Sequence, residues 1–464
     1  MTDIEKQTIK KLHELFVKKT ISPIELLQET FKRAQNAESK INAFREFTSD
    51  LAVKSARVAE NKFLKGQNNS HVLGIPFSVK DNIDVEGVKS CFGSRSKPVE
   101  PNVSAPVVKS LFASGGCLIG KTNMTEFGAK ASSDSPLSGV TSNPRNINYT
   151  TGGSSAGAAA SVAAGVTSFA IGTDGGGSSR IPASFCGLVG FKPTFGLIPV
   201  YPPPIVGDLF HIGIIARSIP DVLEVFRVVI NQNQNSNIKK SEAAINSKSL
   251  GTHIKPKKIK FFWSLSNQVP DPAVKNAVEK ALEICSAAGV EIVQSEPALT
   301  VSVYEIFESK FLGGIVKKVS SVPNFSQFGD REIIQETERY LDQPPLSEKY
   351  VAAEIEKLEK FFCHALQNTE LLMCPTVLHK PFLKSSTRPP DTEALGILEW
   401  PSNCILANLL GLPAVTIPCG TTSDGLPIGI QLISSRYKDI ELLSNANMIY
   451  ELFGMPFSSP TIVG

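Results

Sequence analysis

Residues 172–196 read GTDGGGSSRIPASFCGLVGFKPTFG, so three consecutive glycines lead directly into two serines and an arginine. A short cluster of Gly and Ser usually forms a flexible turn. Here an apolar run at residues 169–171 precedes the cluster and a second apolar stretch follows it, which predicts a fixed turn between a strand and a helix. The backbone N–H groups from Gly175 to Ser178 would then converge on one point, as stabilisation of an oxyanion requires.

A second serine and glycine cluster, GGSSAG at residues 152–157, runs into a stretch made almost wholly of small residues. Residues 156–164 (AGAAASVAA) are typical of a buried helix that packs closely against its neighbours. Such a helix would hold Ser154 and Ser155 in fixed positions. Two rigid serine clusters favour a functional site over a pair of linkers.

The third element is a lysine at the end of an apolar run, Lys80 in GIPFSVKDN at residues 74–82. Most lysines are solvated surface residues. At a buried strand end, however, desolvation disfavours the ammonium form and lowers the pKa of the lysine. The neutral amine is then a usable base.

Taken together, these segments resemble the amidase signature family. Three motifs occur in the family's order and with its spacing between the two serines, and the resemblance runs from about Ile21 to the C-terminus, densest before Gly196. The matching segments are GIPFSVKDNID (74–84), the stretch from Asn143-Pro144 through TTGGSSAGAAASVAAG (143–165), GTDGGGSSRIPASFCGLVGFKPTFG (172–196) and the late run NLLGLP (408–413) that continues through DGLPIGIQLI (424–433).

The resemblance implies roles for the site residues. Ser178 would be the acyl nucleophile and Lys80 the base. Ser154 would bridge the two, in a cis peptide after Gly153. No cofactor is implied, and the sequence has no His, Cys and Asp cluster with the spacing of metal ligands. The implied oxyanion hole is the backbone of Gly175, Gly176, Gly177 and Ser178, and the implied supporting side chains are Ser155, Asp174 and Arg180.

The implied fold is α/β, with a large, twisted, mostly parallel or mixed central sheet covered by helices on both faces. We expect one amidase domain over residues 1–464, with its signature core at 73–200. The polar stretch 231–257 has too little apolar content to fold alone, which predicts an exposed loop.

Local patterns predict several elements. Ser22 and Glu25 form a capping-box pattern with a proline between them, which predicts a helix from there to about residue 35. Apolar periodicity and turn residues place the rest. Helices are expected at 105–113 and 271–288, and strands at 75–79, 117–119, 167–171, 259–263, 290–293 and within 414–434.

The composition fits an ordinary globular protein, with 42% hydrophobic and 20% charged residues and a formal net charge of +3. No basic patch suggests nucleic acid or an anionic membrane as a partner, so the expected substrate is a small, mostly uncharged amide. Residues 1–16 lack the apolar core of a signal peptide, which predicts a cytoplasmic protein without a membrane span. The eight cysteines contain no CxxC pair, which disfavours disulfides and structural zinc. The oligomeric state is left open, with a homodimer as one option.

Residues 115–122 (GGCLIGKT) match the P-loop pattern G-x-x-x-x-G-K-S/T, which would indicate an NTPase. A P-loop requires a strand before its first glycine and a helix directly after the Lys-Thr pair. Here the apolar strand lies inside the motif, and a helix-like segment at 105–113 precedes it. The context therefore disfavours the NTPase interpretation.

Residues 153–157 (GSSAG) match G-x-S-x-G, the nucleophile elbow of α/β-hydrolases. That elbow must follow a strand, whereas residues 144–150 are polar and read as irregular. The elbow also requires a histidine, and none of the candidates has a convincing setting. The candidates are His211, His253, His364 and His379.

Within the resemblance, residues 207–214 (GDLFHIGI) lack the Gly-Pro usual at this place and do not match the A component of glutamyl-tRNA(Gln) amidotransferase. This favours a stand-alone amidase, while a glutaminase-type A component within an amidotransferase complex stays open as the alternative. We expect the acyl pocket to come from the variable segments 201–210, 303–321 and 396–402. Their aromatic residues indicate an apolar or aromatic acyl group. These residues are Phe210, Phe307, Phe311 and Trp400.

Overall fold

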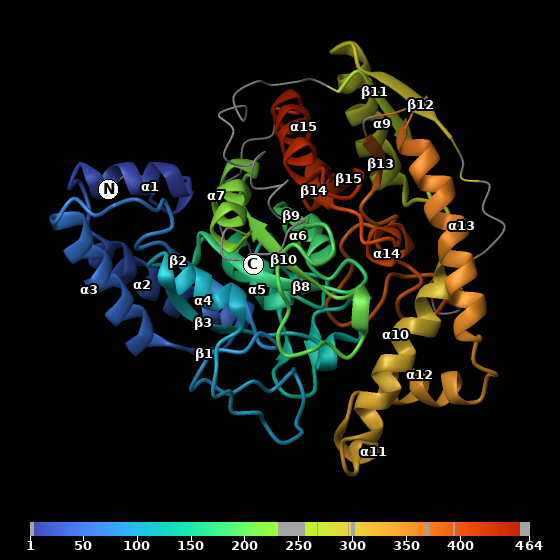
Figure 1. The fold of residues 1–464 in the computed structure, drawn as a ribbon, viewed down its shortest axis with the longest axis horizontal. Coiled ribbons are helices and arrows are strands. Elements are labelled where there is room, and N and C mark those ends of the chain that lie inside the picture. Colours follow the sequence, from blue (N-terminus) through green and yellow to red (C-terminus); the bar gives the residue numbers. More distant parts are fainter. Residues whose placement is uncertain are drawn as a thin grey trace.

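The computed structural model describes residues 4–230, 256–266, 268–295, 297, 302–367, 369, 371–392 and 395–454. Its central feature, within those residues, is one sheet of 11 strands (Figure 1). The strands of this sheet are β1 (Phe44–Phe47), β2 (Pro76–Lys80), β3 (Cys117–Thr122), β8 (Phe169–Asp174), β9 (Val189–Lys192), β10 (His211–Ala216), β11 (Lys258–Phe261), β12 (Glu291–Gln294), β13 (Leu371–Pro375), β14 (Ala414–Thr421) and β15 (Pro427–Ile433). Two separate hairpins pair β4 (Asp134–Ser135) with β5 (Gly139–Val140) and β6 (Ser142–Asn143) with β7 (Asn146–Thr150).

The strand order is β1-β3-β2-β8-β10-β9-β14-β15-β13-β11-β12. Of the ten neighbouring pairs, four are parallel and six are antiparallel. The expected α/β class and the large sheet, expected to be mostly parallel or mixed, are confirmed, and the sheet is mixed. One physical reason for the antiparallel pairs is the short connection between β14 and β15, because a turn of a few residues can join only antiparallel neighbours.

Helices surround the sheet, and among the described helices none is long and apolar enough to cross a membrane. The α-helices are α1 (Ile9–Val17), α2 (Pro23–Ile41), α3 (Ser49–Leu64), α4 (Pro106–Ala113), α5 (Ala156–Ala163), α6 (Arg180–Cys186), α7 (Ile219–Ile230), α9 (Pro272–Ala287), α10 (Val303–Ser320), α11 (Phe325–Phe328), α12 (Arg331–Leu341), α13 (Glu348–Gln367), α14 (Ser402–Leu409) and α15 (Asp439–Leu452). The short 3-10 helices are η1 (Ile4–Lys6), η2 (Glu126–Gly128) and η3 (Gly207–Leu209).

The predicted capping box opens α2. The Ser22 hydroxyl accepts the Glu25 N–H at 3.2 Å, and the Glu25 carboxylate accepts the Ser22 N–H at 2.8 Å. The helix continues past the predicted end, because Ala37 and Ile41 still lie on its buried face. It ends at Asn42, which has a left-handed backbone (φ 48°).

The other local predictions fall on observed elements. The expected strands coincide with β2, β3, β8, β11, β12, β14 and β15, and the expected helices with α4 and α9. The predicted loop at 231–257 lies outside the described residues, apart from residues 256 and 257. That loop and the single-domain assignment stay predictions.

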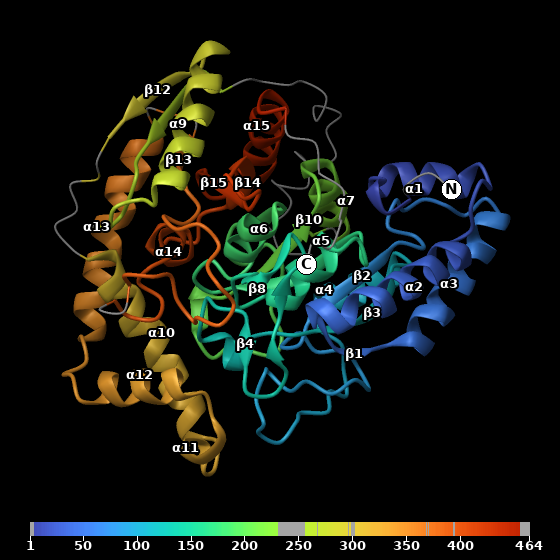
Figure 2. The ribbon, with the colours of Figure 1, turned by 180° about the vertical axis from the view of Figure 1, so that it is seen from behind.

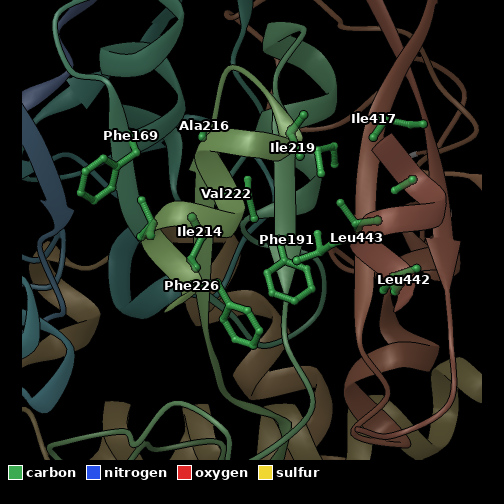
Figure 3. Packing of buried hydrophobic residues seen from close by; sticks show 14 of the residues in the cluster. Phe169, Phe191, Ile214, Ala216, Ile219, Val222, Phe226, Ile417, Leu442 and Leu443 are labelled. Atoms are coloured by element: carbon green, nitrogen blue, oxygen red, sulfur yellow. The ribbon is translucent and has the colours of Figure 1, made fainter. Parts of the chain in front are cut away.

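Two layers of helices cover the sheet, because successive residues of a strand point to opposite faces. In β8, Phe169 and Ile171 belong to the apolar cluster that includes α4, α7, α9 and α15, whereas Ala170 belongs to the cluster of α5 and α6. Figure 3 shows the first of these faces, where the rings of Phe191 and Phe226 lie 5.1 Å apart. The expected helical cover on both faces is confirmed.

Helices α1 to α3 lie at one end of the molecule and α10 to α13 at the other (Figures 1 and 2). An apolar cluster joins α10, α13 and α14 to α6, the helix that follows the glycine-rich turn. A Cβ atom added at Gly176 would lie 2.6 Å from Phe307 Cζ. The second half of the chain thus packs directly against this turn.

Candidate active site

Three segments meet at the carboxyl edge of β2 and β8, which are parallel neighbours. Lys80 ends β2 and Asp174 ends β8, so their side chains start from the same edge of the sheet. Ser154 precedes Ser155, the residue at the start of α5. Ser178 lies between β8 and α6, which confirms the predicted turn between a strand and a helix.

Lys80 is fully buried and points at Ser154. Its Nζ lies 2.8 Å from Ser154 Oγ and 2.8 Å from Thr173 Oγ1. The amide of Asn82 donates a further hydrogen bond to Thr173 Oγ1 at 3.2 Å. The peptide between Gly153 and Ser154 is cis, as the resemblance implied. These contacts fix the lysine amine against one serine hydroxyl.

Burial changes the proton affinity of this lysine. Desolvation lowers the pKa of Lys80 from 10.5 to about 7, while the negative charge of Asp174 acts in the opposite direction. A substantial fraction of Lys80 is therefore neutral near neutral pH. A neutral amine has a lone pair and can accept the Ser154 proton.

Ser178 is the accessible serine of the site. It is half-buried, whereas Ser154 is 1% exposed, and both line the same pocket. The Ser155 N–H donates to the Ser178 carbonyl at 3.2 Å, which ties the two serine clusters together. The Ser178 hydroxyl makes no hydrogen bond to another residue of the described chain, so it is free toward the pocket.

The glycine-rich turn presents backbone donors beside Ser178. No described residue accepts the N–H groups of Gly175, Gly176 or Ser178. The N–H of Gly177 instead donates to the Asp174 carboxylate at 2.8 Å. The structure thus leaves three of the four expected oxyanion donors unengaged, and it uses the fourth to hold the turn.

A buried ion pair supports the turn from behind. The Arg180 guanidinium donates to both oxygens of Asp174, at 2.8 and 3.0 Å. Burial alone would raise the pKa of Asp174, but the adjacent Arg180 charge holds that pKa well below its usual value. Arg180 also donates to Asn408 at 2.6 Å and to the side chain of Gln431. The supporting network therefore extends to α14 and β15.

The pocket above Ser178 has an empty volume of about 970 Å³, including the part open to solvent. Its walls are largely apolar and contain three consecutive prolines. The lining residues are Asn82, Ile83, Phe92, Phe127, Gly128, Ser154, Thr173, Gly175, Ser178, Val200, Tyr201, Pro202, Pro203, Pro204, Ile205, Val206, Phe210, Ile212, Phe311 and Lys318.

Two of the three expected wall segments contribute to the pocket. Phe210 and Phe311 line it, as expected. Phe307 instead packs under the glycine-rich turn, and Trp400 is buried in the core at 1% exposure. Residues 396–402 contribute no lining residue, so the third segment is wrong. Aromatic residues in such segments often pack into the core rather than line a pocket. Only the packing of α10 and α14 decides which of the two an aromatic residue does.

Several contacting residues escaped assignment from the sequence. Thr173, Asn408 and Gln431 lie inside the quoted motifs, but nothing in their spacing indicates that they meet Lys80 or Arg180. Asn82 lies inside the lysine motif, two residues after Lys80, and could have been noted.

The structure rules against the P-loop interpretation. Strand β3 occupies most of the motif at 115–122, and no helix follows its Lys-Thr pair directly. The side chain of Lys121 is buried, where it donates to the Ile83 carbonyl at 2.7 Å and to Ser90 Oγ at 2.9 Å. It cannot reach a phosphate.

The interpretation of residues 153–157 as a hydrolase elbow is disfavoured for a different reason. Residues 146–150 form strand β7, so the expectation of an irregular segment is wrong; pairing with β6 in a hairpin overrides their polar character. The Ser155 hydroxyl donates to the Thr173 carbonyl at 3.1 Å and has no histidine partner in the described chain. His211 is buried against the Leu209 carbonyl, with its pKa lowered by burial. His253 lies outside the described residues.

Within the described chain, no group of three or more His, Cys, Asp or Glu residues is arranged to hold a metal ion.

The sequence model of the amidase family, described as Amidase, matches residues 25–443. The chain belongs to the amidase family. Membership makes it an enzyme that hydrolyses C–N amide bonds. It also confirms the family that the motifs indicate.

Curated relatives cover almost the whole amidase chain. A protein of Clostridium acetobutylicum, named as the second A component of glutamyl-tRNA(Gln) amidotransferase, is 28% identical, with 96% of this chain and 99% of the relative covered. The A component of the same kind of amidotransferase from a Nostoc species is 30% identical, with coverage of 98% and 99%.

Solved structures of amidases share the fold. A bacterial aryl acylamidase of the amidase signature family superposes with a TM-score of 0.87 at 20% identity, with 98% of each chain covered. A 6-aminohexanoate cyclic dimer hydrolase superposes with a TM-score of 0.83 at 22% identity, with coverage of 99% and 100%. At these identities the likeness concerns the fold alone.

Proposed function

We propose that this protein is a stand-alone amidase that hydrolyses small carboxamides through an acyl-enzyme on Ser178. One observation carries the proposal. Lys80, with a pKa of about 7, is hydrogen-bonded to Ser154 at 2.8 Å, and Ser154 lines one pocket together with the accessible Ser178. This arrangement supports Lys80 as the base, Ser154 as the relay hydroxyl and Ser178 as the nucleophile.

The chemistry proceeds in two halves. In the first, Ser178 Oγ attacks the amide carbon while its proton passes to Ser154 Oγ, which passes its own proton to Lys80 Nζ. The oxyanion binds the N–H groups of Gly175, Gly176 and Ser178. Lys80 then returns the proton through Ser154 to the leaving nitrogen, and the C–N bond breaks.

In the second half, water replaces the amine. It gives a proton to Lys80 through Ser154 as its oxygen attacks the acyl ester. Collapse of the tetrahedral intermediate breaks the ester bond. The proton returns to Ser178 Oγ, so the products are a carboxylic acid and an amine, and the enzyme is regenerated.

The test is the identity of the acylated residue. A fluorophosphonate reagent should add one label, and peptide mapping should place it on Ser178. The Ser178→Ala variant should resist labelling and lose turnover, while the same change at the exposed Ser286 of α9 should alter neither. A label on Ser155 would support the hydrolase elbow and refute the proposal.

The A component of an amidotransferase is the second candidate, because the curated relatives carry that name. Free glutamine carries an ammonium and a carboxylate group on its α-carbon, at the other end of the side chain from its amide. Among the described residues that line the pocket, no carboxylate is present to pair with the ammonium. This favours the stand-alone amidase. The purified chain should hydrolyse neutral amides and leave glutamine intact; glutamine hydrolysis that appears only with a partner protein would favour the amidotransferase.

A further inference from the structure

A single lysine stands out in the apolar pocket. Lys318 lies in the last turn of α10 and is half-buried. It lines the same pocket as Ser154 and Ser178, and no other charged side chain lines that pocket in the described part of the chain. A lone ammonium in an apolar cavity would lack strong solvation on the pocket side, which favours an anion there.

The ammonium of Lys318 contacts aromatic rings rather than an acidic side chain of the described residues. Its Nζ lies 5.7 Å from the ring centre of Phe92 and 5.3 Å from that of Phe127. None of the acidic side chains that the structure describes forms an ion pair with it. Lys310 of the same helix, in contrast, pairs with Asp208 at 2.7 Å. The aromatic faces hold the ammonium in place without neutralising its charge.

The two rings are held in uncommon backbone conformations. Phe92 has φ 58° and Phe127 has φ 51°, in the left-handed region that bulky residues rarely adopt. The Phe127 N–H donates to the Phe92 carbonyl at 2.8 Å, which couples the two. Such strained conformations tend to persist at functional sites, where the surrounding structure imposes them. The surrounding structure therefore holds the Phe92 and Phe127 rings in place under Lys318, as part of the pocket wall.

We propose that Lys318 selects substrates by binding an anionic group, most simply a carboxylate, at the far end of an amide from its reacting carbonyl. This inference rests on the proposed function, since Ser178 defines the reacting end. Ile205, Val206 and Phe210 line the same pocket with apolar side chains, so an apolar spacer would join the amide to the carboxylate. The substrate class is an amide that carries one carboxylate on an aliphatic or aromatic chain.

Matched substrates test the inference through turnover. Glutaryl p-nitroanilide and 5-methylhexanoyl p-nitroanilide have the same shape and differ in the terminal carboxylate. N-benzoyl-4-aminobutyrate and N-(4-methylpentyl)benzamide form the corresponding pair with the carboxylate on the amine side. In at least one pair, kcat/KM of the wild type should favour the carboxylate by about ten- to a hundredfold, because a hydrogen bond to a charged group contributes on that scale.

Variants then assign the preference to one residue. Lys318→Met should abolish it by lowering kcat/KM for the carboxylate member while leaving the neutral member nearly unchanged. Lys318→Arg should keep much of it. Lys317→Met is the matched control, because Lys317 is exposed in the same helical turn and does not line the pocket. A wild type without preference in either pair, or a preference that survives in Lys318→Met, would overturn the inference.

Binding without turnover separates this inference from the proposed function. In the Ser178→Ala background, calorimetry should detect glutaramate binding that weakens about tenfold or more when Lys318→Met is added. The neutral 5-methylhexanamide should not distinguish the two proteins. If no amide is hydrolysed but glutaramate binding depends on Lys318, the proposed function fails and the anion site stands. If neutral amides are hydrolysed and glutaramate binding ignores Lys318, the anion site is wrong and the amidase stands.

Discussion

Lys80 Nζ lies 2.8 Å from Ser154 Oγ, and both side chains are almost completely shielded from solvent. Ser154 lines the pocket together with Ser178, so it lies between the buried lysine and that cavity. The surroundings of the site therefore set the protonation state of Lys80, and the activity should change with that state.

The first prediction concerns pH. Because Lys80 must be neutral to accept a proton, kcat/KM should rise with pH through about 7, the pKa of Lys80, and level off about one unit above it. Steady-state rates on a neutral amide between pH 5.5 and 9.5, a range of about four units around that pKa, measure this rise. A rate that falls as the pH increases through 7 would exclude Lys80 as the base.

The second prediction separates a base from a fixed positive charge. Lys80→Met cannot accept a proton, and Lys80→Arg stays protonated at any workable pH, so both should lose nearly all turnover. Thermal melting serves as the control for folding. Wild-type activity in Lys80→Arg would mean that the lysine acts only by its charge.

The third prediction concerns stability. Between pH 7 and the unfolded pKa of 10.5, the unfolded chain holds a proton on Lys80 that the folded chain releases. The free energy of unfolding of the wild type should therefore rise with pH relative to that of Lys80→Met. Urea denaturation at pH 7, 8 and 9 measures the difference. A difference that is constant across this range would show that burial does not lower the pKa.

The fourth prediction concerns the buried ion pair. Asp174→Asn leaves the Arg180 charge uncompensated in the core, which should cost about 3–5 kcal/mol of unfolding free energy. The contribution of Asp174 is fully present above its unfolded pKa of 3.8 and is lost as the pH falls through its lower folded value. Glu356→Gln removes an exposed partner of Lys360 and is the control, for which urea melts should show no change. Equal melts for both variants would mean that the Arg180 network does not hold the turn.

The sequence predicted the local elements of the site better than its tertiary contacts. Lys80 at a strand end and Ser178 on a turn between a strand and a helix follow from apolar runs and glycines, which are local signals. Arg180 meets Asn408, 228 positions away, and Gln431, 251 positions away. Such contacts depend on the order of the strands, which propensity does not encode.

The same reasoning explains what stayed open in the fold and what was wrong in the pocket. The resemblance implied a mostly parallel or mixed sheet without giving the direction of each strand, and the later strands pair antiparallel. Trp400 was assigned to the pocket from its residue type, and packing against the core decided otherwise. Nothing in the sequence predicted a role for Lys318 in the pocket, because that role depends on its contact with the rings of Phe92 and Phe127.

The last prediction concerns the glycine beside the nucleophile. Gly177 has φ 107°, and a Cβ there would lie 2.5 Å from Cys404 Cβ, so Gly177→Ala must displace the turn or α14. Moving the turn shifts the Ser178 N–H from the oxyanion, a loss that should lower kcat about a hundredfold. Gly139→Ala is the matched control, because Gly139 also has positive φ (73°) but nothing lies within 4 Å of its Cβ position. That control should lose only about 1–2 kcal/mol of stability and keep its kcat, because its strain is confined to a remote hairpin. Equal kcat values for the two variants would show that the backbone of the glycine-rich turn does not bind the oxyanion.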